Sequence, residues 1–572
     1  MIILVVLAAL VAMAAWLGVR GWLAKGELEQ LQAIKPALSQ AISAHDTGAL
    51  SAALDDAHAH AARAADLTGD PLWRATEGLP VVGANTAAVR VAAESLRDVS
   101  GAALPLAGEL TNVGGDADAA GGIDLSGLGR LAAPLRAAAD AAADAQTRLG
   151  ALDTGALLAP LCSGITDLDQ LVTSVAPLLD QAVRAVTVVP TMLGSEGDRT
   201  ILVMVQNPAE ARTGGGITGS FISLLASAGH LRLGDHATSS DFARGAVSAT
   251  FPEEITALYG ADVGDFVMNV TVTPDFDTSA HFARAWWQTL GKAAPDAVIS
   301  IDPAVLAALL RIAGPLTLSD GTSVDAGTVT ETILVRPYLA LTTDGQTAIQ
   351  SDLIERLFTR LLATPFDPTA WAGALAESVS EGRVSIWSAH PDEQAVLADS
   401  PFAGTLARYR AAGDDAIGVY FNDATTGKMD TFLDAAIGVS SRVCRADGVA
   451  EVDVAVTLHN TATDASRGYP PSMAGGANPA LPGDITTDVT VAVPTGWFFG
   501  GVTSAGATVA STDIDITAPA SVSRVQLTPG QQSTTVFRFY AGDGGESPEP
   551  TIVHTPMMNP IRVEQSPAQA CG

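Results

Sequence analysis

The sequence predicts a multidomain chain with an N-terminal transmembrane helix, an α-helical stalk, a central α/β domain with a mixed sheet, and a C-terminal β-sandwich. No charged side chain precedes Arg20, helical periodicity then continues to about residue 190, and strand-like alternation dominates the C-terminal part. A chain of 572 residues is too long for a single hydrophobic core. We expect four segments: an anchor (1–22), a helical stalk or bundle (23–190), the central α/β domain (191–428) and the β-sandwich (429–572).

The N-terminal segment has the composition of a membrane span. Its apolar run, Ile2–Val19, would extend about 27 Å as a helix, close to the thickness of a bilayer core. Trp16 and Trp22 suit the membrane interface. A cleaved signal peptide is the alternative, because the small residues at 12–15 resemble a cleavage site. We expect a single-pass protein of the cell membrane, with the bulk of the chain extracytoplasmic.

Helical periodicity continues through the stalk. Apolar residues at 28, 31, 34, 38 and 42 step by three or four, the spacing that lines one face of a helix. Breakers such as "TGDP" (68–71) and "LPVVGAN" (79–85) divide the region into about five helices.

The pattern changes in the central region. The stretches "RTILVMVQN" (199–207) and "ITGSFISLLAS" (217–227) are strand-like, and helix-like segments then alternate with short apolar runs such as "DAVISID" (296–302). This alternation favours a layered α/β domain around a central sheet. The strand-like stretches "RVSIWSA" (383–389) and "DAIGVYFND" (415–423) are expected to complete the same domain.

The C-terminal part alternates apolar and polar residues in short runs. "EVDVAVTLHN" (451–460) and "TTVFRFY" (534–540) show this alternation between turns rich in proline, glycine and serine, which indicates an antiparallel, immunoglobulin-like β-sandwich. Cys444 before its first strand and Cys571 near the end of the sequence are candidates for a disulfide in an oxidising exterior. Two free thiols are the alternative.

Composition excludes several classes of function. Acidic residues outnumber basic ones by 62 to 31, which opposes a nucleic-acid partner, because binding to phosphate backbones depends on lysine and arginine. The three cysteines show no CxxC spacing, and we predict no metal site from them. No GxSxG or HExxH motif occurs, so hydrolase chemistry has no support in the sequence.

The stretch "ARTGGGITGSF" (211–221) combines an arginine with bare backbone. Gly214, Gly215 and Gly216 lack Cβ atoms, so their amides can converge on an anion, and Arg212 adds a planar set of donors. The lysine and terminal Ser/Thr of a P-loop are missing, so an ordinary nucleotide site is not indicated. The alternative is a tight turn or β-bulge with a surface arginine.

Longer motifs carry a family resemblance. "DPLWRATEGLPVVGAN" (70–85), "VQNPAEARTGGGITGSF" (205–221), "NVTVTPDFDTSA" (269–280) and "DAVISIDPAVLAALLRIAGPLTL" (296–318) closely resemble the bacterial domain-of-unknown-function family 4012, which has no settled activity. More distantly, residues 199–318 are similar to the catalytic domain of the LytR-CpsA-Psr enzymes, which transfer glycopolymers from polyprenyl pyrophosphate carriers onto the cell wall.

The second resemblance implies candidate site residues. Those enzymes bind pyrophosphate with arginines and hold a divalent metal with aspartates. Arg212 matches the arginine before the second strand, whereas the acidic residue expected after it is replaced by glycines. Asp241 and Arg244 fall where an arginine and aspartate pair is expected, and Asn269 and Asp275 are further polar candidates. The alternative for Asp275 is a helix cap, because an apolar helical run follows it.

These observations leave two functions open. As a binding or scaffold module, the protein would recognise a glycan of the cell envelope or a polyprenyl phosphate lipid, and the missing acidic residue favours this interpretation. As a transferase, it would move a glycopolymer from its lipid carrier with Mg²⁺ as cofactor; outside this alternative the cofactor is unknown. Whether the protein is an enzyme stays open at this point.

Overall fold

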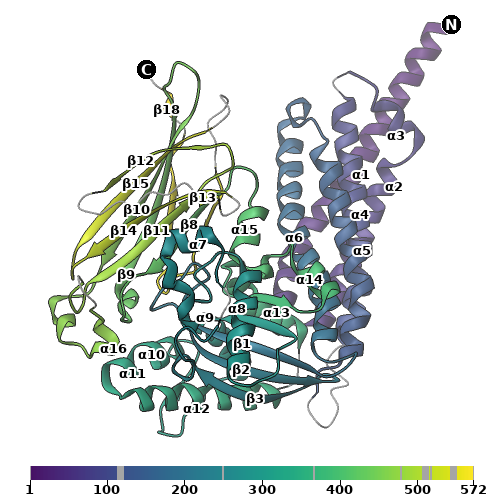
Figure 1. Ribbon diagram of the computed structural model, residues 1–572. Helices are drawn as coiled ribbons and strands as arrows, with labels where there is room; N and C mark the ends of the chain where they lie inside the picture. Colours follow the sequence, from purple (N-terminus) through teal and green to yellow (C-terminus); the bar gives the residue numbers. More distant parts are fainter. Residues whose placement is uncertain are drawn as a thin grey trace. The chain divides into compact units, whose positions relative to one another are not determined.

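A computed structural model describes the whole chain except residues 1, 45, 81, 113–121, 248–249, 365–366, 477–479, 505–513, 516–517, 542–549, 568 and 571–572. The chain forms two compact units (Figure 1). The first contains residues 1–196, 228–230 and 365–370, and the second contains residues 197–227, 231–364 and 371–572. Each unit is described by itself.

The first unit is a helical bundle in its described part. Its elements are α1 (Ile2–Ser43), α2 (Thr47–Thr68), α3 (Pro71–Thr76), α4 (Gly83–Asn112), α5 (Leu125–Gly150), η1 (Thr154–Ala156) and α6 (Ala159–Met192). Successive long helices pack against one another, and buried alanines such as Ala64 and Ala93 let α2 and α4 approach closely. Aspartates cap several helices: Asp46 accepts from the amide of Ala49, as an N-cap residue should. The predicted helical stalk is thereby confirmed.

In the described part of the chain, one helix is long and apolar enough to cross a bilayer, by length and composition alone. This helix is α6. The same helix contributes Ile165 and Val172 to the core that it shares with α4 and α5. The N-terminal helix α1 begins at Ile2, but the side chains of residues 2–12 and 14 lie outside the described part. The N-terminal anchor therefore stays a prediction.

A mixed five-stranded sheet forms the centre of the second unit. In spatial order, its strands are β3 (His230–Thr238), β2 (Ile217–Ser227), β1 (Arg199–Asn207), β4 (Ala297–Ile301) and β7 (Ser385–Ser388). Strand β1 pairs antiparallel with β2 and parallel with β4, and β7 closes the order antiparallel to β4. Both strands at the start of the domain and the mixed sheet agree with the sequence prediction.

Further helices lie between these strands in sequence or follow them. They are η2 (Ser239–Asp241), α7 (Glu253–Tyr259), η3 (Ala261–Asp265), η4 (Val267–Asn269), α8 (Phe276–Thr289), α9 (Pro303–Ala313), α10 (Val329–Leu334), α11 (Arg336–Ala340), α12 (Thr343–Leu362), α13 (Pro368–Ser380), α14 (Pro391–Leu397), η5 (Pro401–Ala403) and α15 (Thr405–Ala411). Trp286 and Trp287 of α8 pack into one apolar core with Leu202 and Met204 of β1. Strands β5 (Leu316–Thr317) and β6 (Ser323–Val324) form a separate two-stranded ladder.

Two further sheets follow in the same unit. The first contains β12 (Phe498–Ser504), β15 (Gln532–Tyr540), β10 (Glu451–Asn460), β9 (Leu433–Val443) and β17 (Arg562–Gln565), with β18 (Gln569–Ala570) also on β9. The second contains β13 (Ile514–Asp515), β14 (Pro519–Leu527), β11 (Ile485–Ala492), β8 (Ile417–Asp423) and β16 (Ile552–His554). Three short helices, η6 (Met429–Phe432), η7 (Asp464–Gly468) and α16 (Pro471–Ala474), lie between strands in sequence.

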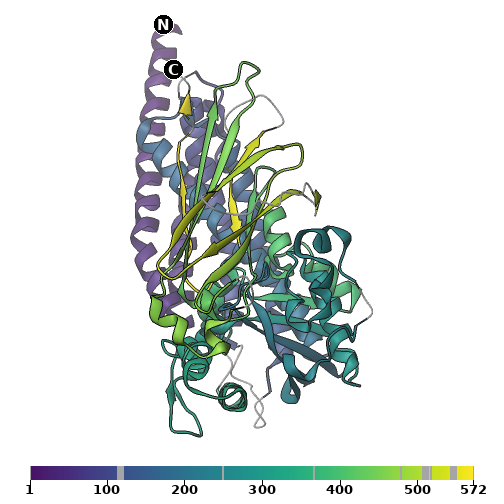
Figure 2. The ribbon, with the colours of Figure 1, turned by 60° about the vertical axis from the view of Figure 1, so that its left-hand side comes forward.

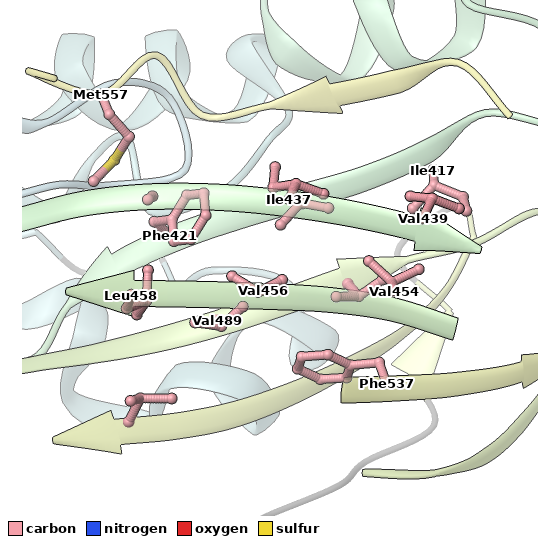
Figure 3. Packing of buried hydrophobic residues seen from close by; sticks show 14 of the residues in the cluster. Ile417, Phe421, Ile437, Val439, Val454, Val456, Leu458, Val489, Phe537 and Met557 are labelled. Atoms are coloured by element: carbon pink, nitrogen blue, oxygen red, sulfur yellow. The ribbon is translucent and has the colours of Figure 1, made fainter. Parts of the chain in front are cut away.

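One apolar core joins these two sheets. Figure 3 shows Phe421 of β8 and Val489 of β11 from one sheet, together with Ile437 of β9, Val456 of β10 and Phe537 of β15 from the other. Alternate residues of β10 are buried, so one face of the strand packs inward. The second unit thus ends in a two-sheet sandwich; its immunoglobulin-like character stays a prediction.

Strand β8 corrects one prediction. The sequence assigns residues 415–423 to the central α/β domain, yet β8 pairs with β11 and β16 in the sandwich. Every residue of β8 is buried, because it occupies an inner position of its sheet. Its neighbours in the ladder come from more than 60 residues further along the chain. Short-range periodicity contains no information about such pairing.

Cysteine pairing is described in part. Cys444 is disulfide-bonded and Cys162 is free. Cys571, the predicted partner, lies outside the described residues. The parallel pairing of β18 with β9 sets Ala570 beside Val443, and these are the residues that precede the two predicted partners.

Candidate functional site

The arginine and glycine stretch forms the loop between β1 and β2. Asn207 and Ile217 are paired at the base of this hairpin. A Cβ atom on Gly216 would lie 2.3 Å from the carbonyl of Asn207, so only glycine fits there without a backbone shift. Gly215 has a φ of +129°, which also favours glycine. The predicted turn is thus present, and two of its glycines have a geometric reason.

Three amides of this loop already have acceptors within the protein. Thr213 N donates to Asn422 Oδ1 at 3.0 Å, Gly214 N to Thr271 O at 2.9 Å, and Gly215 N to Arg212 O at 2.7 Å. A phosphate bound by these amides would have to displace their present acceptors. The phosphate-binding role of Gly214, Gly215 and Gly216 stays a prediction.

Arg212 is half-buried and joins three segments of the second unit. Its Nε donates to Asn269 Oδ1 at 3.0 Å, and its Nη1 donates to Ala211 O at 2.8 Å and to Asp423 O at 3.0 Å. Asn269 in turn donates to Val263 O at 3.0 Å. The structure therefore brings together two predicted site residues, Arg212 and Asn269, and fixes both against the end of β8.

The other predicted residues make their contacts elsewhere. Asp241 accepts from Thr238 N at 2.7 Å in a capping box at η2. Exposed Arg244 pairs with Asp265 at 3.1 Å and lies over the ring of Phe266 at 4.8 Å.

Asp275 caps α8. It accepts hydrogen bonds from the amides of Asp277 and Thr278 at 3.2 and 3.3 Å. The capping interpretation of Asp275 is therefore confirmed, and its role as a ligand residue stays a prediction.

A buried cluster of charged residues adjoins Arg212, and sequence reasoning missed it. Lys428 and Glu210 form a buried ion pair, and Asp430 accepts from Ala211 N at 2.8 Å. Asp423 accepts from Thr425 N at 2.9 Å. Although Asp423 and Asp430 are only 6% and 1% exposed, one carboxylate oxygen of each has no hydrogen-bond partner. The cluster thus contains two buried carboxyl oxygens without a hydrogen-bond partner.

Burial shifts the ionisation of these aspartates. Desolvation raises the pKa of Asp430 to about 7, and Glu210 adds to the rise against the opposing hydrogen bond from Ala211. Desolvation and the neighbouring Asp430 raise the pKa of Asp423 well above its ordinary value. Burial alone would lower the pKa of Lys428, but Glu210, Tyr338 and Asp423 together raise the pKa above its ordinary value, so the ammonium keeps its charge. The cluster therefore prefers to retain a proton on one of the two aspartates.

A cavity of about 160 Å³ lies next to the same loop. Most of its lining side chains have hydroxyl or amide groups: Gln206, Asn207, Ser220, Thr238, Ser239, Ser240, Tyr338, Thr343, Gln346, Thr347 and Gln350. Leu306, Ile333, Leu334 and Leu353 add apolar surface. Lys428 is the one charged residue in the described lining, and its Nζ lies 5.1 Å from the centroid of the Tyr338 ring. The cavity thus combines hydrogen-bonding groups with an aromatic ring and a single, already paired cation.

Metal-ligating residues are not grouped in the described chain. No three or more His, Cys, Asp or Glu side chains of the described residues are placed to hold a metal ion. The candidate site is therefore the cavity and the loop beside it.

Comparison with known proteins agrees with the family resemblance. Residues 196–338 match the family described as "Protein of unknown function (DUF4012)". The match supports the DUF4012 family for this region of the chain. No curated protein and no solved structure matches the chain. The DUF4012 region contains Arg212, Asn269 and Tyr338, whereas Lys428, Asp423 and Asp430 lie beyond it. The buried charges thus join the DUF4012 region to the part of the chain that follows it.

Proposed function

We propose that the protein is a membrane-anchored, extracytoplasmic recognition module that binds a glycan of the cell envelope in the cavity beside the β1–β2 loop. The apolar N-terminal segment supports the anchor, and the acidic composition suits a domain exposed outside the cytoplasm. The lining of the cavity is the observation that carries the proposal.

Sugar hydroxyls require partners that donate and accept hydrogen bonds. Serine, threonine, glutamine and asparagine side chains supply both functions, and they make up half of the described lining residues. Tyr338 offers an aromatic face to the C–H groups of a sugar ring. The volume of about 160 Å³ is smaller than the roughly 300–1,000 Å³ of pockets for drug-sized ligands, so the cavity suits one sugar unit.

A mildly anionic sugar best fits the charge of the cavity lining. Lys428 has three donors, and Glu210 engages one of them in the buried pair. A carboxylate or phosphate substituent would find a cation here, although Glu210 already balances much of its charge. In this proposal Arg212 holds the loop and the nearby Glu210 in position; it does not contact the ligand.

Transfer of a glycopolymer from a polyprenyl pyrophosphate carrier is the second candidate. The LytR-CpsA-Psr resemblance and the position of Arg212 beside the cavity favour it. It would require a divalent ion such as Mg²⁺, for which the described residues contain no grouped set of ligands. Arg212 is also already bonded to Asn269 and to backbone carbonyls. These observations support recognition more than transfer.

Titration of the full chain in lipid nanodiscs tests the proposal. The ligands are a neutral hexose, an N-acetylhexosamine, a hexuronic acid and a short-chain polyprenyl phosphate, each followed by calorimetry. Saturable binding of a sugar, strongest for the hexuronic acid, is expected. Binding of the polyprenyl phosphate alone, or of none of the four, contradicts the glycan proposal. Mg²⁺-dependent turnover of a polyprenyl pyrophosphate sugar would establish the transferase instead.

A further inference from the structure

Exposed apolar side chains of the helical bundle gather at one of its ends. This end is formed by α3, the turn into α4, and the connection between α5 and α6. Leu72, Leu79, Val82 and Leu158 are 54%, 50%, 46% and 66% exposed, and we call these four residues the apolar end. Leu158 N donates to Asn85 Oδ1 at 2.9 Å, which ties the start of α6 to the start of α4. The four residues therefore belong to one surface of the first unit.

Helix α1 leaves the bundle at the same end. Arg20 of α1 forms an ion pair with Asp70, the residue that caps α3. A Cβ on Gly21 would lie 3.7 Å from the ring of Trp73 in α3. Figures 1 and 2 both show α1 continuing past α3 toward the N-terminus. The apolar segment Ile2–Val19 thus extends directly from the apolar end.

Charged groups at this end are largely neutralised. The ion pairs of the described residues there include Arg20–Asp70, Arg74–Glu94 and the pairs of Arg90 with Glu77 and Glu94. Exposed Asp153 accepts a hydrogen bond from Gly155 N at 3.1 Å. Such pairing lowers the cost of bringing these side chains close to an apolar phase. Each of these three arginines is paired with a carboxylate, so they do not form an unpaired positive patch that would select anionic lipids.

We propose that the apolar end lies in the interfacial layer of the same bilayer that α1 spans. This inference rests on the anchor in the proposed function and adds a second, peripheral contact with the membrane. A lipid surface is the occupant that the continuity with α1 favours, because residues next to the end of a membrane span must lie near the headgroups. Trp22, 73% exposed on α1, has the amphipathic ring that this layer accommodates. Two contacts would fix the tilt of the bundle, which a single helix leaves free.

Fluorescent labelling of the full chain in phosphatidylcholine vesicles tests this contact. Leu79→Cys and Leu158→Cys, each in a Cys162→Ser background, receive an environment-sensitive dye. Leu178→Cys is the matched control, because Leu178 is a similarly exposed leucine (59%) further along α6. We expect a blue shift at 79 and 158 and loss of their emission when the lipids carry a quencher near the headgroup. The dye at 178 should show neither effect.

Two results would overturn the inference. In the first, alkaline carbonate leaves the protein in the vesicles, which shows that the anchor holds, but the dyes at 79 and 158 behave like the dye at 178. The apolar end then lies in water. In the second, carbonate releases the protein, and the anchor fails together with the inference. A photoreactive lipid added to the unmodified chain gives the same answer without substitutions. It should label peptides covering 71–83 and 157–160 and spare the one covering 171–178.

Discussion

Arg212 donates from its Nε to Oδ1 of Asn269 at 3.0 Å, and its Nη1 contacts two backbone carbonyls. The residue selected from the sequence as a ligand donor thus uses its Nε and Nη1 to hold the fold. Arg212→Ala should lower the free energy of unfolding of the second unit by at least the about 1.5–3 kcal/mol of one charge-assisted hydrogen bond. Denaturant unfolding followed by tryptophan fluorescence measures this loss.

Arg244→Ala is the matched control for Arg212→Ala. Arg244 also pairs with a carboxylate, but both partners are largely exposed, so its loss should cost only about 0.2–1 kcal/mol. The two substitutions could instead lower the free energy of unfolding equally, while only Arg212→Ala loses ligand binding. That result would favour the direct phosphate contact that the sequence suggests.

The two buried aspartates make stability depend on pH. A carboxyl with a raised pKa in the folded state binds more protons there than in the unfolded chain, so its contribution is present at low pH and is lost as pH rises. For Asp430 this loss runs from about 4, the unfolded value, through about 7. The histidines His236 and His554 oppose it, because burial lowers their pKa values and their contribution grows with pH.

The substitution Asp423→Asn separates the effect of the aspartates on stability from that of the histidines. Asparagine keeps an oxygen for Thr425 and adds an N–H group where Asp423 has an oxygen without a partner. We expect the variant to unfold at a higher denaturant concentration than wild type at pH 8, and the difference to shrink at pH 5. Unfolding midpoints at pH 5, 6.5 and 8 measure it. A difference that does not change with pH would show that Asp423 is ionised throughout.

Gly216→Ala tests the geometry of the loop. Because its Cβ would lie 2.3 Å from the carbonyl of Asn207, the hairpin base must shift, at a cost of about 3 kcal/mol. Gly219→Ala in the same hairpin is the control, since a Cβ there meets no atom within 4 Å. Thermal unfolding should show a clear loss for position 216 and almost none for 219. Similar midpoints for both would mean that the loop adapts.

Local features of this fold are predictable from the sequence. Strand β1 has the predicted bounds of 199–207, because a run of β-branched and apolar residues ends at a proline and a glycine-rich turn. Asp275 is also predictable as a helix cap, because an apolar helical run follows it directly in the sequence. Contacts between distant segments are not predictable in this way. Lys428 pairs with Glu210 across 218 residues, and no periodicity links the two positions.

In the candidate site, too, only the local features are predictable from the sequence. The sequence identifies the loop through Arg212 and its glycines, since both features are local. It does not identify the cavity, whose lining comes from β1, β2, β3, η2, α9 to α12 and Lys428. Hydroxyl and amide side chains are common on any surface, so Gln350 or Thr347 gives no signal until the fold places it beside Tyr338.

Filling the cavity should weaken sugar binding while the fold persists. Gly219 lines the cavity, and a Cβ built on it meets no atom within 4 Å, so Gly219→Val fits and takes up free space at the wall. Valine also favours the strand conformation of β2. We expect calorimetry with the hexuronic acid to show at least a tenfold weaker affinity, equivalent to about 1.4 kcal/mol, with an unchanged unfolding midpoint.

Removing a single hydroxyl from the cavity lining tests sugar binding there by a smaller change. Thr347→Val keeps the shape of the side chain and removes one hydrogen-bonding group from the lining. Loss of one neutral hydrogen bond should weaken sugar binding by about 0.5–1.5 kcal/mol. Thr457→Val, which removes an exposed Thr457–Thr534 hydrogen bond in the sandwich, should leave binding unchanged. If Gly219→Val and Thr347→Val both bind sugar like wild type, the ligand does not occupy this cavity, and the hydroxyl and amide groups there serve only the packing of α10, α11 and α12 against the hairpin.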